Sequence, residues 1–560
     1  MKKFTAILLA VVMLFALSAS AFAATNSLET DYAIGDGLGV SVDLDIEGMY
    51  FDGVDILNTA TNGYYPFSFS LIASDRTKVA SVTVSNGGSF HWAYAQNADG
   101  SYVTDADGNY VESTTTNYGV VVLPTTSAST VTVTGTDNIG SATFNCAQPS
   151  GGTTAAGASL YAYLPAPAQF VNEGVTTGGW GDAYDSNGTV KATSSTGVSL
   201  GFFGGYAVYE FENPIADDPT HPYGADFIVY GNAFWNNSEA GCIQVSKDGA
   251  TWYDIAGSMY YTKSTKGATI TYTNPNATED AGITIPASNK GTLADVPYAL
   301  TVNGTTTTGT VTKNTFHNHS WFPLNVNYFV DYVTTETTRK QMAKVDEFSF
   351  VSRTLNSGNI TNTLTFTGTL LTDYPGTGKT DQIGFGYCDV HPNKTLGGTI
   401  AYNPYQTFTS SSDYDTKVAG TSGGDPIDIA WAVKPNGTPA NLDSIRYVRI
   451  YTGMAQMNGI FGEISTEVCG VAACTGTGAG KATTDLVVRR LNQTIPTENN
   501  KAVSVAAGNF RITSAEENVY VNGVKVTASS GYTLNVVAGK SYQIITQSGT
   551  EAPYITVLVG

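Results

Sequence analysis

The chain has 560 residues, with 27 Lys plus Arg against 47 Asp plus Glu, so its formal net charge is −20. Only 13% of the residues are charged, whereas 42% are apolar and 11% are aromatic, which argues against a disordered chain. The acidic balance disfavours nucleic acid and anionic lipid as main partners, because phosphate groups are bound by clustered Lys and Arg. At about 150 residues per domain, we expect two to four domains.

The first segment has the pattern of a secretory signal peptide. Lys2 and Lys3 precede an apolar stretch at residues 6–16, and the small-residue site Ala21-Phe22-Ala23 follows. The apolar stretch is short for a membrane span, and no later stretch is apolar enough to be one. We therefore expect residues 1–23 to be removed, and the mature protein to be extracellular, either secreted or held at a bacterial cell surface.

Residues 24–150 are predicted to form a first β-sandwich, of immunoglobulin-like type. Val40 and Val42 alternate with polar neighbours, and Val131 and Val133 alternate with threonines. A period of two places one face of a strand in a core and the other in solvent. A Gly- and Ala-rich linker at 151–157 is expected to end this domain.

Two further domains follow, so the fold class we predict is all-β with three sandwich or jelly-roll-type domains. The central domain is expected over residues 158–470, and a small C-terminal β domain over 483–560 after a second Gly-rich linker. In the last domain, Asn522-Gly523 stands between Val-rich alternating runs, which is a strong signal for a hairpin with a two-residue turn.

The central domain carries the most specific motifs. They include Y-L-P-A-P-A-Q-F-V-N at 163–172, G-A-D-F-I-V-Y-G-N-A-F at 224–234, V-S-K-D-G-A-T-W at 245–252, and V-R-I-Y at 448–451. In this order the motifs resemble a family of bacterial cell-surface proteins over most of residues 160–470. The third and fourth are also similar to pieces of discoidin-type, galactose-binding-like jelly rolls. That resemblance implies a β-sandwich whose loops bind glycans or another surface component, here with an inserted β-rich segment at about 263–380.

Aromatic side chains offer candidate ligand contacts, because sugar rings stack their C–H faces on Trp and Tyr. Trp180, Trp235 and Trp321 stand in Gly-, Asn- or His-flanked segments that are typical of loops, and Tyr223 stands beside a proline. For each of these residues, burial in the core remains an open alternative. Trp252 and Trp431 stand in strand-like runs, so we expect both to pack in the core.

A calcium site is also expected in the central domain. Asp389, Asn393, Asp425 and Asp428 lie in two Gly- or Pro-broken segments that could converge, and their side-chain oxygens suit Ca2+. The jelly-roll resemblance implies a structural calcium ion near the binding loops. The alternative is that these residues are solvated turn residues.

Catalysis has weaker support. The chain has 5 His and no convincing nucleophile motif. A glycosidase would need two facing carboxylates, but such residues commonly accept hydrogen bonds from turns. The candidates are Asp226, Glu239, Asp389, Asp428 and Glu463. We therefore predict a non-catalytic protein that binds a glycan or another surface polymer. The alternatives are a structural surface-layer or fibre subunit capable of self-assembly, and a carbohydrate-active enzyme.

The cysteines do not form a disulfide framework. There are 5 of them, an odd number. Cys469 and Cys474 are close in sequence, but their spacing is poor for zinc. We expect isolated buried thiols, or one disulfide at most.

Overall fold

The computed structural model describes most of the chain after the predicted signal peptide. The described residues are 30–35, 38–43, 49–51, 55–58, 68–86, 88–95, 103–106, 109–122, 129–146, 157–171, 197–233, 237–249, 251–275, 294–314, 317, 319–323, 351–355, 361–372, 384–400, 402–459, 462–478, 480 and 484–560. The signal peptide, Trp180 and Trp235 lie outside the described residues, so the predictions made for them stay predictions.

The predicted all-β class is confirmed. Strands account for 47% of the described residues and helices for 5%. Within the described ranges the one α-helix is α3 (Ser411–Lys417), whose first turn is capped by the Ser410 hydroxyl accepting from the Asp413 N–H. Among the same residues, no helix is long and apolar enough to cross a membrane.

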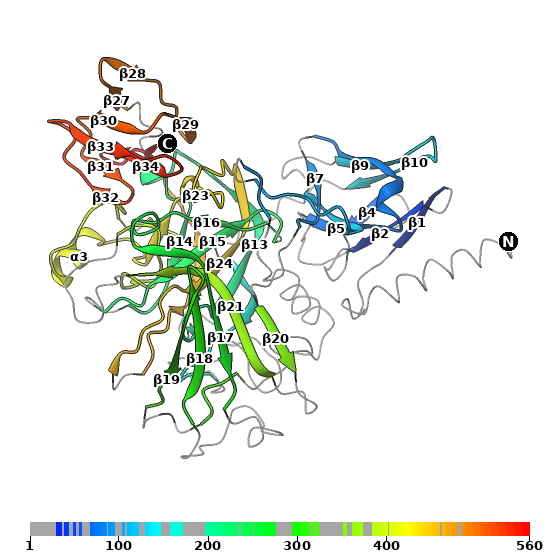
Figure 1. Ribbon diagram of the computed structural model, residues 1–560, viewed down its shortest axis with the longest axis horizontal. Helices are drawn as coiled ribbons and strands as arrows, with labels where there is room; N and C mark the ends of the chain where they lie inside the picture. Colours follow the sequence, from blue (N-terminus) through cyan, green and yellow to red (C-terminus); the bar gives the residue numbers. More distant parts are fainter. Residues whose placement is uncertain are drawn as a thin grey trace.

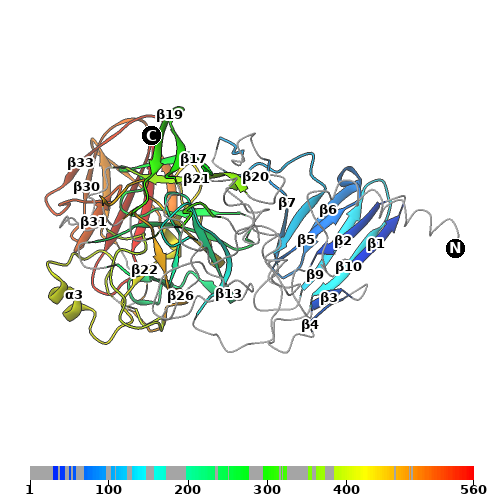
Figure 2. The same ribbon diagram turned by 90° about the horizontal axis from the view of Figure 1, so that it is seen from below.

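Two five-stranded sheets form the N-terminal module, which we define as strands β1 to β10. In the order of pairing, the first sheet contains β1 (Thr30–Gly35), β2 (Leu38–Asp43), β5 (Ser68–Ala73), β8 (Tyr118–Val122) and β7 (Ser89–Trp92). The second contains β3 (Met49–Phe51), β4 (Asp55–Asn58), β10 (Ser141–Cys146), β9 (Ser129–Gly135) and β6 (Val79–Val84). In β9 every second residue is buried, as the Val–Thr alternation predicts, and Val131 and Val133 share a core with Leu71 and Val121 from the first sheet. Figure 2 shows the strands of this module set apart from the rest of the chain.

The central module, strands β11 to β26, is built around a six-stranded sheet. In the order of pairing, that sheet contains β11 (Ser159–Leu164), β13 (Tyr206–Ala216), β24 (Ser444–Thr452), β15 (Gly241–Ser246), β16 (Tyr253–Ile255) and β23 (Ala432–Val433). Two smaller sheets accompany it. One pairs β12 (Val198–Ser199) with β25 (Glu467–Val468), and the other contains β22 (Asp425–Ile427), β14 (Phe227–Tyr230) and β26 (Gly470–Ala473).

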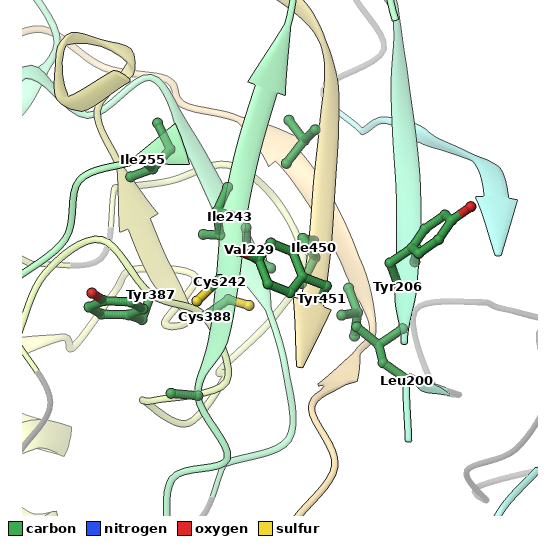
Figure 3. Close-up of a cluster of buried hydrophobic side chains, with 14 of the residues drawn as sticks. Leu200, Tyr206, Val229, Cys242, Ile243, Ile255, Tyr387, Cys388, Ile450 and Tyr451 are labelled. Atoms are coloured by element: carbon green, nitrogen blue, oxygen red, sulfur yellow. The ribbon is translucent and has the colours of Figure 1, made fainter. Parts of the chain in front are cut away.

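The motif at 245–252 forms a hairpin. β15 pairs antiparallel with β16 around Asp248-Gly249, and Gly249 has a φ of 73°. Trp252 and Trp431 are both buried, as expected, and the Arg449 guanidinium lies 4.1 Å above the Trp252 ring. Figure 3 shows Ile243, Ile450 and Tyr451 from β15 and β24 in a common apolar cluster.

The inserted segment forms a five-stranded antiparallel sheet. In the order of pairing it contains β19 (Thr305–Val311), β18 (Val296–Val302), β17 (Ser264–Thr273), β21 (Thr361–Leu371) and β20 (Val351–Leu355). Ile270, Tyr272, Leu364 and Phe366 on one face of this sheet belong to the same core as the six-stranded sheet. The inserted sheet is therefore packed against the six-stranded sheet. Figure 1 shows its strands projecting from the rest of the central module.

The C-terminal module, strands β27 to β35, again contains two sheets. The first contains β28 (Gln493–Ile495), β27 (Val487–Arg490), β30 (Gly508–Thr513) and β33 (Tyr532–Val536). The second contains β29 (Lys501–Ser504), β35 (Tyr554–Val559), β34 (Ser541–Gln547), β31 (Asn518–Val521) and β32 (Val524–Lys525). The predicted hairpin is confirmed, since β31 pairs with β32 and the turn residues Asn522 and Gly523 have φ values of 48° and 74°. β35 is paired on both sides, so it does not offer the open strand edge that self-assembly through the C-terminal strand would need.

The C-terminal module packs directly on the central one. Tyr520, Ile545 and Ile555 belong to the central core, and the Tyr520 hydroxyl donates to the Tyr405 carbonyl at 2.7 Å. The N-terminal module makes a more polar contact, in which His91 Nε2 lies 2.9 Å from Asp248 Oδ2. The exact limits of the three predicted domains stay predictions.

Four cysteines are free thiols, namely Cys242, Cys388, Cys469 and Cys474. Cys242 and Cys388 lie inside the central core, where Figure 3 shows them next to each other. Burial raises the pKa of both thiols far above the ordinary value. They act as small apolar side chains, which agrees with the predicted burial of isolated thiols.

Candidate functional site

The two described aromatic candidates have different surroundings. Trp321 has no exposed surface, and its indole N–H donates to the His317 carbonyl at 3.1 Å, so the ring is part of the core and presents no face to a ligand. Tyr223 is half-buried in the 3-10 turn η2 (Pro222–Gly224), with a φ of 62°. That backbone region is unfavourable for a bulky side chain.

The four predicted calcium ligands fall in different surroundings. Asp425 accepts from the Val390 N–H at 3.1 Å and lies 2.9 Å from His391 Nδ1. The Asn393 amide donates to the Gly231 carbonyl. Asp389 and Asp428 belong to two separate groups of three carboxylates, each with oxygens within 4.8 Å of one another.

The first acidic group contains Glu239, Asp389 and Glu467. Asp389 accepts from the Asn232 N–H at 2.7 Å and from the Glu467 N–H at 3.0 Å, while the Ser199 hydroxyl donates to Glu467 at 3.2 Å. Burial raises the pKa of Asp389 and Glu467 well above the ordinary range, and raises that of Glu239 to about 7. Because the carboxyl oxygens of this group are already hydrogen-bonded and their pKa values are raised, the carboxyl groups can remain protonated and uncharged.

The second acidic group, which we call the junction cluster, contains Asp217, Asp226 and Asp428. The strand register explains part of it. Phe227 of β14 pairs with Ile427 of β22, so the aspartates that flank these residues lie at the same end of the small sheet. Asp428 then caps the 3-10 turn η4 (Ile429–Trp431) through a 2.7 Å bond from the Ala430 N–H to Oδ1.

Hydrogen bonds are distributed unevenly within the junction cluster. Asp226 accepts from the N–H groups of Asp218 and Ile429, both at 2.9 Å, and its Oδ1 lies 3.4 Å from His221 Nδ1. Asp428 is 1% exposed, but among the described residues its Oδ2 has no hydrogen-bond partner. Leaving a carboxylate oxygen buried and unpaired is costly.

A cavity of about 100 Å³ lies beside the unpaired oxygen. Its lining comes from the central and C-terminal modules: Asp217, Pro219, Gly224, Asp428, Ala430, Asn499, Asn500, Ala552 and Pro553. The Oδ1 of Asn500 is also buried, and no residue in the described ranges forms a hydrogen bond with it. Burial and the neighbouring carboxylates raise the pKa of Asp428 well above its ordinary value, and burial raises that of Asp226 to about 6. The cavity therefore combines negative potential with unused oxygen acceptors.

Sequence reasoning missed Asp217 and Asn500. Asp226 and Asp428 could have been linked, because both flank short apolar runs that are typical of paired strands. Asn500 stands in a separate module, and nothing local in the sequence indicates which part of the central module it meets.

No model of a known protein family matches the chain, and no curated protein matches it.

Proposed function

We propose that the mature chain is a non-catalytic protein of the bacterial surface that binds a glycan or another surface polymer through its central module. In this proposal the central module is a discoidin-like jelly roll, and the flanking modules act as spacers or assembly units. The signal-peptide pattern, the acidic charge and the β-rich fold support export and a surface role.

One observation supports the location of the binding surface, namely the strained backbone of Tyr223. The residue stands between Pro222 and Gly224, and Gly224 lines the acidic cavity. The Tyr223 N–H donates to the Thr550 carbonyl at 2.9 Å, which holds the turn against the C-terminal module. A left-handed backbone costs free energy at an aromatic residue, and such strain is often found at functional sites. The half-buried Tyr223 ring packs in part against the apolar cluster that contains Ile228 and Tyr230, and its remaining face suits a sugar ring.

A glycan array probed with residues 24–560 tests the proposal, and selective binding is the expected result. Tyr223→Asn should abolish that binding, because asparagine tolerates the left-handed backbone while the aromatic ring is removed. Tyr532→Ala is the matched control, since Tyr532 is also half-buried but belongs to the far sheet of the C-terminal module.

The control should retain binding, although it should lower the melting temperature because Tyr532 packs against the C-terminal core. Uniformly flat binding by the intact chain would contradict the proposal, and so would unchanged binding by Tyr223→Asn. Turnover of a bound polysaccharide would favour the carbohydrate-active enzyme.

A further inference from the structure

The cavity at the junction cluster has the properties of an oxygen-ligand metal site. Asp217, Asp226 and Asp428 bring three carboxylates within 4.8 Å of one another, and the nearby His221 contacts Asp226 at 3.4 Å. Asp226 already has three hydrogen-bond contacts. Asp428 Oδ2 and Asn500 Oδ1 are buried acceptors without a donor in the part of the chain that the structure describes, and both residues line the same cavity.

We propose that this cavity binds one Ca2+ ion, held by Asp217, Asp428 and Asn500, and that the ion fastens the C-terminal module to the central module. The proposal does not depend on glycan binding.

The geometry suits a hard cation of this size. Ca2+ takes oxygen ligands at about 2.3–2.6 Å, so two ligands of one ion are separated by at most about 5 Å. The spacing within the junction cluster meets this limit. A volume of about 100 Å³ is enough for an ion together with the water molecules that complete its coordination. Carboxylate and amide oxygens favour calcium over zinc or copper, which prefer nitrogen and sulfur ligands.

Gly224 keeps space open beside the unpaired oxygen. A Cβ at this position would lie 2.9 Å from Asp428 Oδ2 and 2.9 Å from a Pro553 ring carbon. Gly224 also has a φ of 73°, which other residues rarely adopt. The absence of a side chain therefore leaves Asp428 accessible from the cavity.

The site would connect two modules because its ligands come from both. Asp217 and Asp428 belong to the central module, whereas Asn500 lies directly before β29 of the C-terminal module. The Asn500 N–H donates to the Ile555 carbonyl at 2.7 Å, and the Ile555 N–H donates to Asn499 Oδ1 at 2.7 Å. An ion bound to Asn500 would thus restrain β29 and β35 together.

The experiment uses residues 24–560, stripped with EDTA and transferred to chelator-free buffer. Isothermal titration with CaCl2 should show binding, and Ca2+ should raise the melting temperature while Mg2+ at the same concentration does not. Hydrogen–deuterium exchange should slow in peptides that cover 497–502 and 550–556. These outcomes follow because the ion binds the folded junction and not the unfolded chain.

Three variants locate the site. Asp428→Asn and Asn500→Ala should each weaken Ca2+ binding by about tenfold or more, and Asn500→Asp should restore or tighten it. Asp425→Asn is the control, because Asp425 is similarly buried but lies outside the cavity lining. If Asp428→Asn fails to fold, the Asn500→Ala and Asn500→Asp variants still decide whether the ion binds in this cavity.

Several results would overturn the assignment. One is that Ca2+ neither binds the intact chain nor raises its melting temperature. The others are an equal rise of the melting temperature with Mg2+, and an unchanged Ca2+ affinity in the Asn500→Ala variant. Loss of affinity in Asp425→Asn with retention in Asn500→Ala would place the ion elsewhere.

Discussion

Single residues in this protein carry charge and strain that their surroundings only partly compensate. Glu463 is 2% exposed, and it accepts from the Gln169 N–H at 3.1 Å through Oε1. Its Oε2 has no hydrogen-bond partner within the described ranges. Burial raises the pKa of Glu463 to about 8, and the charge of Glu239 adds to the shift.

This raised pKa predicts a pH dependence of stability. The unfolded chain ionises Glu463 near pH 4.5, but the folded protein resists ionisation until about pH 8. The contribution of Glu463 to stability is therefore complete below pH 4.5 and is lost as the pH rises through 8. In Glu463→Gln, the change in the free energy of unfolding between pH 5 and pH 8 should shrink by roughly 2–4 kcal/mol relative to the original chain.

Urea unfolding at the two pH values measures this difference. Glu517→Gln, at an exposed position, provides the control and should leave the pH dependence unchanged. An identical pH dependence in Glu463→Gln and the original chain would contradict the prediction.

Trp321 shows where residue-level reasoning from the sequence reaches its limit. Its polar neighbours His317, Asn318 and His319 are typical of a loop, yet the indole ring is fully buried. The described polar neighbours are used inside the fold, since the His317 carbonyl accepts from the indole and His319 Nε2 lies 2.9 Å from the Val171 carbonyl. Whether a polar group faces solvent or a buried partner depends on distant chain segments, which a local pattern does not contain.

At the scale of strands and turns, the sequence predicts the structure better than it predicts the burial of a single side chain. The alternation in β9 and the Asn522-Gly523 turn were both predicted, because each depends on neighbouring residues alone. The tertiary role of the β31–β32 turn was not predictable. A Cβ on Gly523 would lie 1.8 Å from the Ser258 carbonyl oxygen, so this turn approaches the backbone of the central module closely.

Gly523→Ala should therefore weaken the contact between the central and C-terminal modules. The substitution combines the cost of a left-handed backbone with a clash against Ser258. Gly539→Ala is a matched control, since Gly539 has a φ of 73° and open space around its missing side chain. We expect the control to lower stability by about 1 kcal/mol and Gly523→Ala to lower it by roughly 2–4 kcal/mol.

Thermal unfolding of both variants checks the difference. Equal losses in the two variants would mean that the close approach to Ser258 contributes nothing to stability.

At the scale of the whole molecule, the three modules are joined by contacts of different kinds. The C-terminal module shares apolar core with the central module, whereas the N-terminal module contacts it through a titratable pair. His91 Nε2 lies 2.9 Å from Asp248 Oδ2, and Nδ1 lies 3.0 Å from the Trp92 carbonyl. Both neighbours of the ring are acceptors, so the doubly protonated imidazolium satisfies both contacts.

The pKa of His91 reflects this arrangement. Burial lowers it, but the hydrogen bond to Asp248 and the charges of Asp248 and Glu112 outweigh burial, so the net shift is upward from 6.5. The Tyr94 ring, stacked on the imidazole at 4.6 Å, completes the surroundings. The contact therefore stabilises the N-terminal junction fully below pH 6.5 and weakens as the pH rises through the raised pKa.

Small-angle X-ray scattering should detect the weakened junction as a larger radius of gyration at pH 8.5 than at pH 5.5. His91→Gln should remove most of this pH dependence, because a charged hydrogen bond of about 1.5–3 kcal/mol is lost at both pH values. His317→Gln, in the central module, is the control. A constant radius in the original chain over this range would contradict the prediction.

The junction cluster shows why the candidate site was only partly predictable. Asp428 was chosen from the sequence because its segment is broken by Gly and Pro, and the structure does place it beside a cavity. Its neighbours Asp217 and Asn500 come from separate parts of the chain, and Asn500 belongs to a different module. Local spacing can identify a ligand of the right chemistry, but the set of ligands is fixed by how the modules pack.

The position of β24 in the six-stranded sheet has a consequence for biogenesis. β24 lies between β13 and β15, although it follows both by a long stretch that includes the whole inserted sheet. During synthesis, β13 and β15 emerge before β24, with their apolar faces and inner edges unpaired. The six-stranded sheet can form completely only after residues 444–452 have been synthesised. A nascent chain that stalls earlier would expose two unpaired strand edges that are prone to aggregation, and it would depend on chaperones.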